Sequence, residues 1–309
     1  MLDLRRLRLL RELHARGTIA AVADALQYTP SAVSQQLAVL ERETGRTLLT
    51  RAGRGVRLTD DALVLVGHAE VLLRQAELAE ADLAAAAGGG PAGRARIASF
   101  QSMAMRVAIP AIGTLAQAAP GLRCELVEAE PEQSLPALAL GDLDLVLADE
   151  WRHQPRARPD GVVREDILLD PVSLVLPDAH PAVRTGRRAR TAVPLASLAG
   201  APWVTGHPGT GWEEMTVRAC RELGGFDPDV RHRANDSAIG LALVVAGQAV
   251  MLLPQLVGPE GRAGVAVRPI AEGTIDRTIF MATRAADARR PSVVALRDAV
   301  RAAAAAVQR

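Results

Sequence analysis

The chain opens with three segments in which apolar residues recur every three or four positions, the spacing of one helix face. The apolar stripe of the first segment is Leu4, Leu7, Leu10 and Leu13, and that of the second is Ile19, Val22, Ala23 and Leu26. Gly17 is suited to end the first helix and Thr18 to cap the second. The third helix begins after Thr29 with Pro30 in its first turn. It ends at Gly45, so the pattern predicts three short helices.

The third helix separates into two faces when its residues are placed about 100° apart. The apolar face consists of Val33, Leu37, Leu40 and Thr44, and the polar face of Ser31, Ser34, Gln35, Ala38 and Arg42. Short hydroxyls let a helix approach base edges closely, and a Gln amide can pair with adenine. Two helices joined by a tight turn, the second presenting its polar N-terminal part, predict a helix-turn-helix. The alternative is an ordinary helical hairpin with a polar outer face.

The stretch RTLLTRAGRGVRLT, residues 46–59, follows this helix directly. Its glycines and regularly spaced arginines predict a small β-hairpin, the wing of a winged helix. Arginines on such a loop would contact phosphates or enter a minor groove. The alternative is a solvated surface loop. The candidate DNA-binding residues are therefore Thr29, Ser31, Ser34, Gln35, Arg42, Arg51 and Arg54.

A long helix is predicted from Thr59 and Asp60 to about Ala87. It carries a heptad seam of Leu58, Ala62, Leu65, Ala69, Leu72, Ala76, Ala79, Leu83 and Ala86. A seam of this length favours a coiled coil with a second copy, which would match the two-fold symmetry of operator DNA. The alternative is that the seam packs against the chain's own body. The glycine-rich stretch at 87–93 is predicted to be a linker.

From about residue 93 onward, short apolar runs alternate with helical patterns. The predicted strands cover 95–100, 123–130, 143–149, 172–177, 202–206, 250–254, 264–270 and 277–283. The predicted helices cover 102–118, 131–140, 211–223, 236–246 and 291–307. This alternation predicts doubly wound α/β units with parallel strands.

Charge is distributed unevenly along the chain. The net charge is +1 over 309 residues, but residues 1–60 hold ten Arg and six acidic residues, a balance of +4, which leaves −3 for the rest. A basic head on a slightly acidic body is typical of a polyanion-binding module joined to another domain.

Two cysteines, Cys124 and Cys220, fall in a predicted strand and a predicted helix, which favours a reducing compartment over a disulfide framework. A redox-sensing pair is the weaker alternative. The N-terminal MLDLRRLRLL has no uninterrupted apolar core, so we expect no secretory signal. No apolar run reaches the length of a membrane span, and we expect a cytoplasmic protein without a membrane partner.

Residues 2–75 resemble the DNA-binding head of the LysR-type transcriptional regulators. The motifs that carry the resemblance are TIAAVADALQYTPSAVSQQLAVLERETGRTLLTR and GVRLT. The residues that match the family pattern are Ser34, Leu40, Glu41, Gly45, Arg51, Leu58 and Thr59. The family commonly has Gln where Pro30 stands and Arg where Gln35 stands. Both changes bear on base readout, so no operator sequence is carried over.

The body also resembles the family's effector domain, through ARIASFQSM, APGLRCELVEAE and LALGDLDLVLAD. The resemblance implies an α/β protein overall: a winged helix-turn-helix over 1–59, a dimerisation helix and hinge over 60–92, and an effector-binding domain over 93–309. That domain would have two lobes joined by crossing strands, as in periplasmic solute-binding proteins. Lobe 1 is expected at about 93–167 plus 271–309, and lobe 2 at about 168–270.

Ligands of such folds bind in the crevice at the carboxyl ends of strands. The candidate effector-binding residues at these ends are Ser99, Phe100, Gln101, Ser102, Glu130, Asp149, Trp151, Thr205, His207 and Asn235. Each could instead be a helix cap or a satisfied loop residue. Three acidic residues, Glu130, Asp149 and Glu150, weaken the expectation of a carboxylate effector. They could meet an amine, or an arginine from the other lobe.

Catalytic patterns are absent from the sequence. The six histidines lack metal-ligand spacing, and no nucleophile elbow, phosphate loop or dinucleotide fingerprint occurs, so we expect no metal, no cofactor and no enzyme. A free-standing solute-binding protein is the main alternative, but it would need an export signal and no basic head.

We therefore predict a sequence-specific transcriptional regulator. Its partners would be double-stranded operator DNA, a small-molecule effector between the lobes, and itself as a homodimer and homotetramer, with RNA polymerase as a further partner. The effector would act by binding two arrangements of the sensor unequally.

Overall fold

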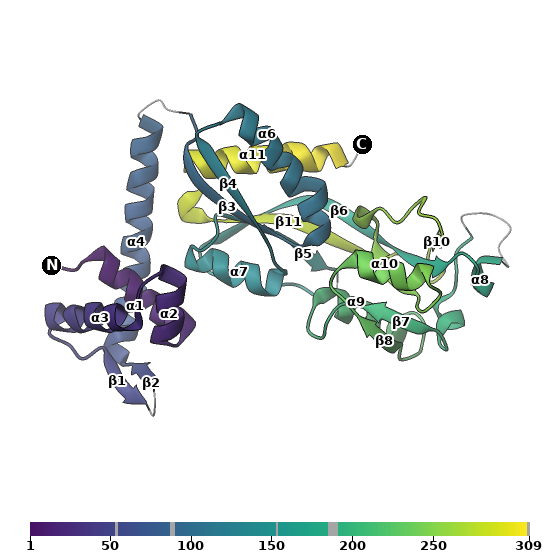
Figure 1. Ribbon diagram of the computed structural model, residues 1–309, viewed down its shortest axis with the longest axis horizontal. Coiled ribbons are helices and arrows are strands. Elements are labelled where there is room, and N and C mark those ends of the chain that lie inside the picture. Colours follow the sequence, from purple (N-terminus) through teal and green to yellow (C-terminus); the bar gives the residue numbers. More distant parts are fainter. Residues whose placement is uncertain (53–54, 87–89, 153, 185–190, 308–309) are drawn as a thin grey trace. The chain divides into compact units, whose positions relative to one another are not determined.

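The structure is a computed structural model of the 309-residue chain, and it describes all residues except 53–54, 87–89, 153, 185–190 and 308–309 (Figure 1). The chain folds into two compact units. One consists of residues 1–90 with 286–291, and the other of residues 91–285 with 292–309. We call them the head and the body.

The head begins with three helices at the predicted positions: α1 (Leu4–Arg16), α2 (Ile19–Leu26) and α3 (Pro30–Thr44). Their caps explain where they begin and end. The Asp3 carboxylate accepts hydrogen bonds from two backbone N–H groups of α1, and Thr18 and Thr29 cap α2 and α3 in the same way. Gly17 and Gly45 end α1 and α3 in the left-handed conformation, with φ of 76° and 65°.

A wing and a long helix complete the head. Strands β1 (Leu49–Ala52) and β2 (Gly55–Leu58) pair antiparallel, as predicted. Helix α4 (Asp60–Ala86) follows, and the Thr59 hydroxyl accepts a hydrogen bond from the Ala62 N–H at its start. The core of the head is a single cluster from α1, α2, α3, the wing and the first turns of α4.

The heptad seam of α4 does not face outward along its whole length. Ala62 and Ala69 are fully buried in the core of the head, and Leu65 packs partly against it. The prediction that the seam meets a partner is therefore wrong for its N-terminal half, because that half closes the head. Among the side chains of α4 that the structure describes, the large apolar ones that are exposed are Leu63, Val64, Val71, Leu72 and Leu83.

The body contains a seven-stranded sheet with the strand order β10-β6-β11-β5-β3-β4, in which β9 also pairs with β6. Its strands are β3 (Gly93–Ser99), β4 (Leu122–Glu128), β5 (Leu145–Trp151), β6 (Val162–Pro177), β9 (Met251–Pro254), β10 (Val265–Arg268) and β11 (Asp276–Arg284). β3 is parallel to β4 and β5, but β11 is antiparallel to both β5 and β6. The expectation of parallel strands is therefore confirmed for β3, β4 and β5 and wrong for β11, because the chain leaves this lobe along β6 and returns along β11.

Helices cover both faces of the first lobe (Figure 1). They are α5 (Gln101–Met103), a π-helical turn (Ala104–Ala108), α6 (Ile109–Ala118), α7 (Pro131–Leu140) and α11 (Pro291–Val307). Alternate strand residues point to opposite faces. Ile97 therefore packs with α6 and α11, whereas Ala98 packs with α7.

The long strand β6 belongs to both lobes. Its residues 162–171 pair with β11, and its residues 172–177 pair with β9 and β10. The second lobe adds the parallel pair β7 (Pro202–Thr205) and β8 (Asp229–Arg233), with α8 (Pro181–Arg184), α9 (Gly211–Glu222) and α10 (Ser237–Val245). Short 3-10 segments cover Leu195–Leu198, Gln255–Val257 and Ala285–Asp287. The sequence pattern did not predict β8, α8 or the first half of β6, whose polar residues hide the alternation of a strand.

Among the described residues, no helix combines the length and hydropathy needed to cross a membrane. Nor do His, Cys, Asp and Glu side chains gather anywhere in that part of the chain in a group of three or more that could hold a metal ion.

Candidate DNA-binding and effector-binding sites

The polar face of α3 is exposed in the head. Ser31, Ser34, Gln35 and Arg42 are all exposed, while Val33, Leu37 and Leu40 are fully or almost fully buried on the opposite face. The packing of α3 against α1 and α2 therefore turns the predicted reading face outward. A helix with this arrangement presents short side chains and an amide to a groove of DNA.

Hydrogen bonds at the start of α3 hold part of this face in place. The Ser34 hydroxyl donates to the Pro30 carbonyl oxygen at 3.0 Å, and the Thr29 and Ser31 hydroxyls are hydrogen-bonded at the same distance. No described residue is hydrogen-bonded to the Gln35 side chain. The amide of Gln35 is thus available for an external partner.

The wing is attached to α3 by a carboxylate. Glu41 Oε1 accepts hydrogen bonds from the backbone N–H groups of Leu48 (2.8 Å) and Leu49 (3.0 Å). The Leu-Glu-x-x-x-Gly pattern therefore has a structural role that was not predicted from the sequence: it fixes the start of β1 beside the C-terminal half of α3.

Several arginines of the head have no carboxylate partner within the described residues. Arg42 on α3, Arg51 on β1 and Arg57 on β2 are exposed and form none of the ion pairs found there. The predicted residue Arg54 lies outside the described residues. Arginines of this kind, beside the exposed polar face of α3, supply charge that can neutralise phosphates.

A small cavity of about 50 Å³ lies between the two lobes of the body. The first lobe contributes Phe100, Gln101 and Ser102 from the start of α5, directly after β3, with Glu130 and Asp149 from neighbouring segments. The second lobe contributes Trp212, Asn235 and Ser237, among others. The structure thus brings six of the predicted effector-binding residues to one place: Phe100, Gln101, Ser102, Glu130, Asp149 and Asn235.

Arg277, which was not predicted from the sequence, is the central cation of this cavity. It is only 5% exposed and lies on β11. Its guanidinium donates to Asp149 at 3.0 Å, to Asp170 at 2.7 Å and to the Ser102 hydroxyl at 3.0 Å. It also lies over the rings of Phe100 and Trp151, 4.8 and 5.6 Å from their centroids. Burial of this charge is possible because two carboxylates compensate it.

Arg156 is the second arginine of the cavity. It donates to Asp149 and to Glu132, both at 2.8 Å, and its backbone N–H donates to Glu150 at 2.9 Å. Of the three acidic residues expected at the crevice, Asp149 and Glu150 therefore do meet arginines, whereas Glu130 pairs with no described arginine. Both arginines lie within the range expected for lobe 1, however, and not on the opposite lobe.

Gln101 connects the two lobes beside the cavity. Its amide nitrogen donates to Asp236 at 2.5 Å, and its oxygen accepts from the Ser237 N–H at 3.0 Å and from the Ser237 hydroxyl at 2.5 Å. Gln101 is the first residue of α5, whereas Asp236 caps α10 and Ser237 is its first residue. One side chain thus joins the start of one helix in each lobe.

The Glu130 carboxylate, which also lines the cavity, differs from these side chains. No described residue donates a hydrogen bond to its side chain, and it forms no ion pair with the described cations. Burial, together with the nearby carboxylates of Asp149, Glu132 and Glu128, raises the pKa of Glu130 to about 7, and Arg277 opposes this shift.

Four predicted residues do not line the cavity. Ser99 is fully buried and its hydroxyl donates to the Phe100 carbonyl, and Thr205 is fully buried against Thr216. His207 lines a neighbouring groove, and Trp151, the fourth, lines a separate pocket.

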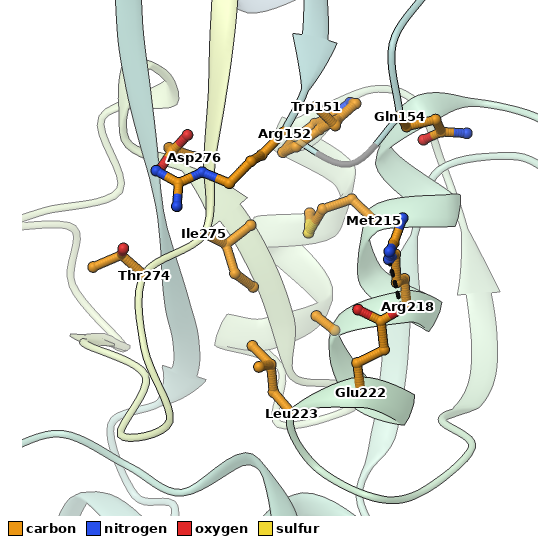
Figure 2. Close-up of a pocket in the computed structure, with 11 residues that line it drawn as sticks. Trp151, Arg152, Gln154, Met215, Arg218, Glu222, Leu223, Thr274, Ile275 and Asp276 are labelled. Carbon is orange, nitrogen blue, oxygen red and sulfur yellow. Dashed lines mark hydrogen bonds and ion pairs between the residues drawn. The ribbon is translucent and has the colours of Figure 1, made fainter.

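The pocket at Trp151 has a volume of about 120 Å³, and Figure 2 shows it. Met215, Leu223 and Ile275 form its apolar wall, and the ion pairs Arg152–Asp276 and Arg218–Glu222 lie at its edge. The indole N–H of Trp151 is buried and has no hydrogen-bond partner among the described residues.

These features define the class of protein. An exposed polar helix face beside a wing, with arginines that have no carboxylate partner among the described residues, is typical of a DNA-binding module, and a two-lobed α/β domain with a cavity between its lobes is typical of a ligand sensor. Comparison with known families agrees. The profile of the LysR substrate binding domain matches residues 88–305, and that of the bacterial regulatory helix-turn-helix protein, lysR family, matches residues 4–63. The chain belongs to the LysR family of DNA-binding transcriptional regulators, in which an effector-binding domain modulates activity.

Individual relatives are similar over most of their length. The DNA-binding transcriptional dual regulator OxyR of Escherichia coli is 28% identical over 282 residues, which cover 91% of this chain and 88% of that protein. A probable hydrogen peroxide-inducible genes activator of Mycobacterium avium is 30% identical over 242 residues, or 78% and 74% of the two chains. A full-length OxyR variant of Pseudomonas aeruginosa has the same fold, with a TM-score of 0.70 at 20% identity over 97% of this chain and 95% of that one.

Proposed function

We propose that α3 reads operator bases through Ser31, Ser34 and Gln35, and that Arg42 and the wing arginines Arg51 and Arg54 bind the phosphate backbone. The observation that carries this proposal is the exposed polar face of α3 beside arginines without carboxylate partners among the described residues. Thr29 caps the helix and orients its first turn. The alternative, a helical hairpin with a solvated face, does not account for those arginines.

The proposed domain boundaries are those expected from the sequence: 1–59 for DNA binding, 60–92 for dimerisation and 93–309 for effector binding. We place the homodimer contact on the exposed apolar residues of α4, Val64, Val71 and Leu72 among them. A homotetramer and a contact with RNA polymerase complete the proposal. A regulator acts where its operator is, so we propose a cytoplasmic location and no catalytic role.

We further propose that the signal is a ligand bound in the interlobe cavity and not oxidation of a thiol. Oxidation is the alternative to consider because the names of two relatives are OxyR and a probable hydrogen peroxide-inducible genes activator. Thiol oxidation requires thiolate character. Burial raises the pKa of both thiols of this chain, that of Cys220 to about 12, so neither is poised to react. Neither cysteine lines the cavity.

The proposal is tested by fluorescence anisotropy with the intergenic duplex beside the gene and with a random duplex, at several salt concentrations. Gln35→Ala should reduce the free energy of binding to the operator by about 1–3 kcal/mol and that of binding to random DNA only slightly. Arg51→Ala should weaken binding to both duplexes and reduce the salt slope by about one unit. Gln117→Ala and Arg123→Ala change exposed residues of the body and serve as matched controls. Equal losses on both duplexes for Gln35→Ala would remove base readout from this residue.

A further inference from the structure

We propose that the interlobe cavity takes a small organic cation, with an ammonium or guanidinium head, and that the Glu130 carboxylate is its ionic partner. This inference rests on the proposed effector site and adds the chemical class of its ligand. Three features support it: the charges around the cavity, its aromatic wall and the groove that adjoins it.

The cations around the cavity are already compensated. Arg277 is bound by Asp149 and Asp170, and Arg156 by Asp149 and Glu132. An anionic effector would have to compete with these buried ion pairs, and separating a buried pair is unfavourable because each charge is left uncompensated. The cavity therefore offers an anion no available charge among its described residues.

Glu130, unlike these cations, is not compensated by an opposite charge among the described residues. Its carboxylate lines the cavity but has no cationic or hydrogen-bonding partner among the described residues. It stands at the N-cap of α7 but does not cap that helix. Three further carboxylates, those of Asp149, Glu132 and Glu128, act on it electrostatically. A cation placed here would meet the one carboxylate of the described cavity lining that no cation compensates.

The shape of the site fits such a ligand. The cavity has a volume of about 50 Å³, and its aromatic lining consists of Trp212 and of Phe100, whose ring also lies under the Arg277 guanidinium. Aromatic faces attract ammonium and guanidinium groups through the negative potential of the ring. An open groove of about 690 Å³ adjoins the cavity, since Gln101, Glu130 and Asn235 line both. The head of the ligand would occupy the cavity and its remainder the groove.

The groove is acidic as well. Glu128 and Asp236 line it together with Glu130, while its basic side chains are His207 and Arg233. Arg233 is paired with Glu213 at 3.2 Å. Because Asp236 also receives the interlobe hydrogen bond of Gln101, a bound cation would act beside a side chain that joins α5 to α10. Occupancy of the site is thereby linked to the contact between the lobes.

The direct test is isothermal titration calorimetry of the full-length protein with 1,4-diaminobutane and with 4-aminobutylguanidine, and with succinate as the charge-reversed probe. We expect binding of at least one cation and no binding of succinate at concentrations up to about 10 mM. Glu130→Gln keeps the side-chain shape and removes the charge, so it should weaken cation binding about tenfold or more. Glu260→Gln changes an exposed carboxylate outside the cavity and should leave binding unchanged.

A pH profile of the unaltered protein gives a second measurement that needs no variant. An alkylammonium stays charged between pH 6 and 8, whereas Glu130, with a pKa raised to about 7 by burial and by Asp149, gains its charge across this range. Cation affinity should therefore rise about tenfold from pH 6 to pH 8. Because an imidazole can also change charge there, the profile is repeated in His207→Gln, where the rise should persist.

The inference is overturned if neither cation binds, if Glu130→Gln binds as the unaltered protein does, if affinity is flat with pH, or if succinate binds more tightly. Operator binding is measured on the same preparation. Specific DNA binding without cation binding refutes the ligand class alone, whereas loss of specific DNA binding refutes the proposed function.

Discussion

The substitution Arg277→Met tests whether one buried arginine holds the crossing strands of the body together. Arg277 lies on β11, and its partners Asp149 and Asp170 lie on β5 and β6. Methionine preserves the apolar contact with the rings of Phe100 and Trp151 while removing the charge and its hydrogen bonds. The variant therefore isolates the ionic contribution.

The size of the expected stability loss depends on the two carboxylates that remain after Arg277 is removed. Breaking a buried ion pair by removing one partner costs about 3–5 kcal/mol because a charge remains uncompensated. Asp149 keeps its contact with Arg156, and Asp170 keeps the backbone N–H of Leu256 at 2.9 Å. We therefore expect the lower part of this range, about 3 kcal/mol. With an m-value of about 2–3 kcal/mol per M urea, the unfolding midpoint should fall by about 1–1.5 M.

Urea unfolding followed by tryptophan fluorescence is the assay. The three tryptophans, Trp151, Trp203 and Trp212, all lie in the body, so the signal reports on that unit. Arg301→Met is the matched control, since Arg301 is 47% exposed and paired with Glu165 at the surface. Such a surface pair contributes at most about 1 kcal/mol.

Two outcomes would refute this reasoning. A midpoint for Arg277→Met no lower than that of Arg301→Met would show that the network does not stabilise the crossing strands. The double variant Arg277→Met with Asp170→Asn removes one uncompensated carboxylate and should recover about 1 kcal/mol or more. Failure to recover would mean that the loss comes from packing and not from charge.

Three further predictions concern the head. Glu41→Ala removes the acceptor of the Leu48 and Leu49 N–H groups, so the free energy of unfolding of the head should fall by about 1–3 kcal/mol. Thermal unfolding followed by circular dichroism measures this change, and unchanged stability would show that Glu41 does not hold the wing. Gln27→Gly relieves a left-handed residue with φ of 57° and should stabilise the head by up to about 1 kcal/mol in the same assay, whereas destabilisation would contradict the strain. Val71→Glu places a charge on the exposed apolar face of α4 and should shift the sedimentation equilibrium toward monomer, while Glu70→Gln should not; equal behaviour would exclude this face as the dimer contact.

Local patterns predicted most of the secondary structure because they act within a few residues. Thr29, Pro30 and Gly45 define the bounds of α3 through capping and backbone conformation alone. The start and end of α7 were likewise predicted from Pro131 to Leu140. β6 was recognised only in its second half, because its first half pairs with β11 over a sequence separation of more than a hundred residues and carries an irregular polar pattern.

The candidate sites divide in the same way. The exposure of the polar face of α3 was predicted from sequence because one amphipathic helix contains both its buried and its exposed residues. The lining of the interlobe cavity was predicted only in part. Residues at strand ends share an edge of the sheet, which is why some of them were recognised. Which of these residues contact one another depends on how the strands are placed in the fold. Ser99 and Thr205 stand at such ends yet are buried in the packing of their own lobes.

Sequence patterns alone were sufficient for the order of most elements, the winged helix-turn-helix, the uneven charge and the family of the chain. Three findings required the folded chain: Arg277 and Arg156 neutralise acids of the cavity, Glu130 is left without a partner among the described residues, and half of the α4 seam is buried in the head. The difference lies in distance along the chain. Capping and amphipathicity join residues a few positions apart, whereas a buried arginine finds its carboxylates 107 and 128 positions away, through a fold that no local pattern specifies.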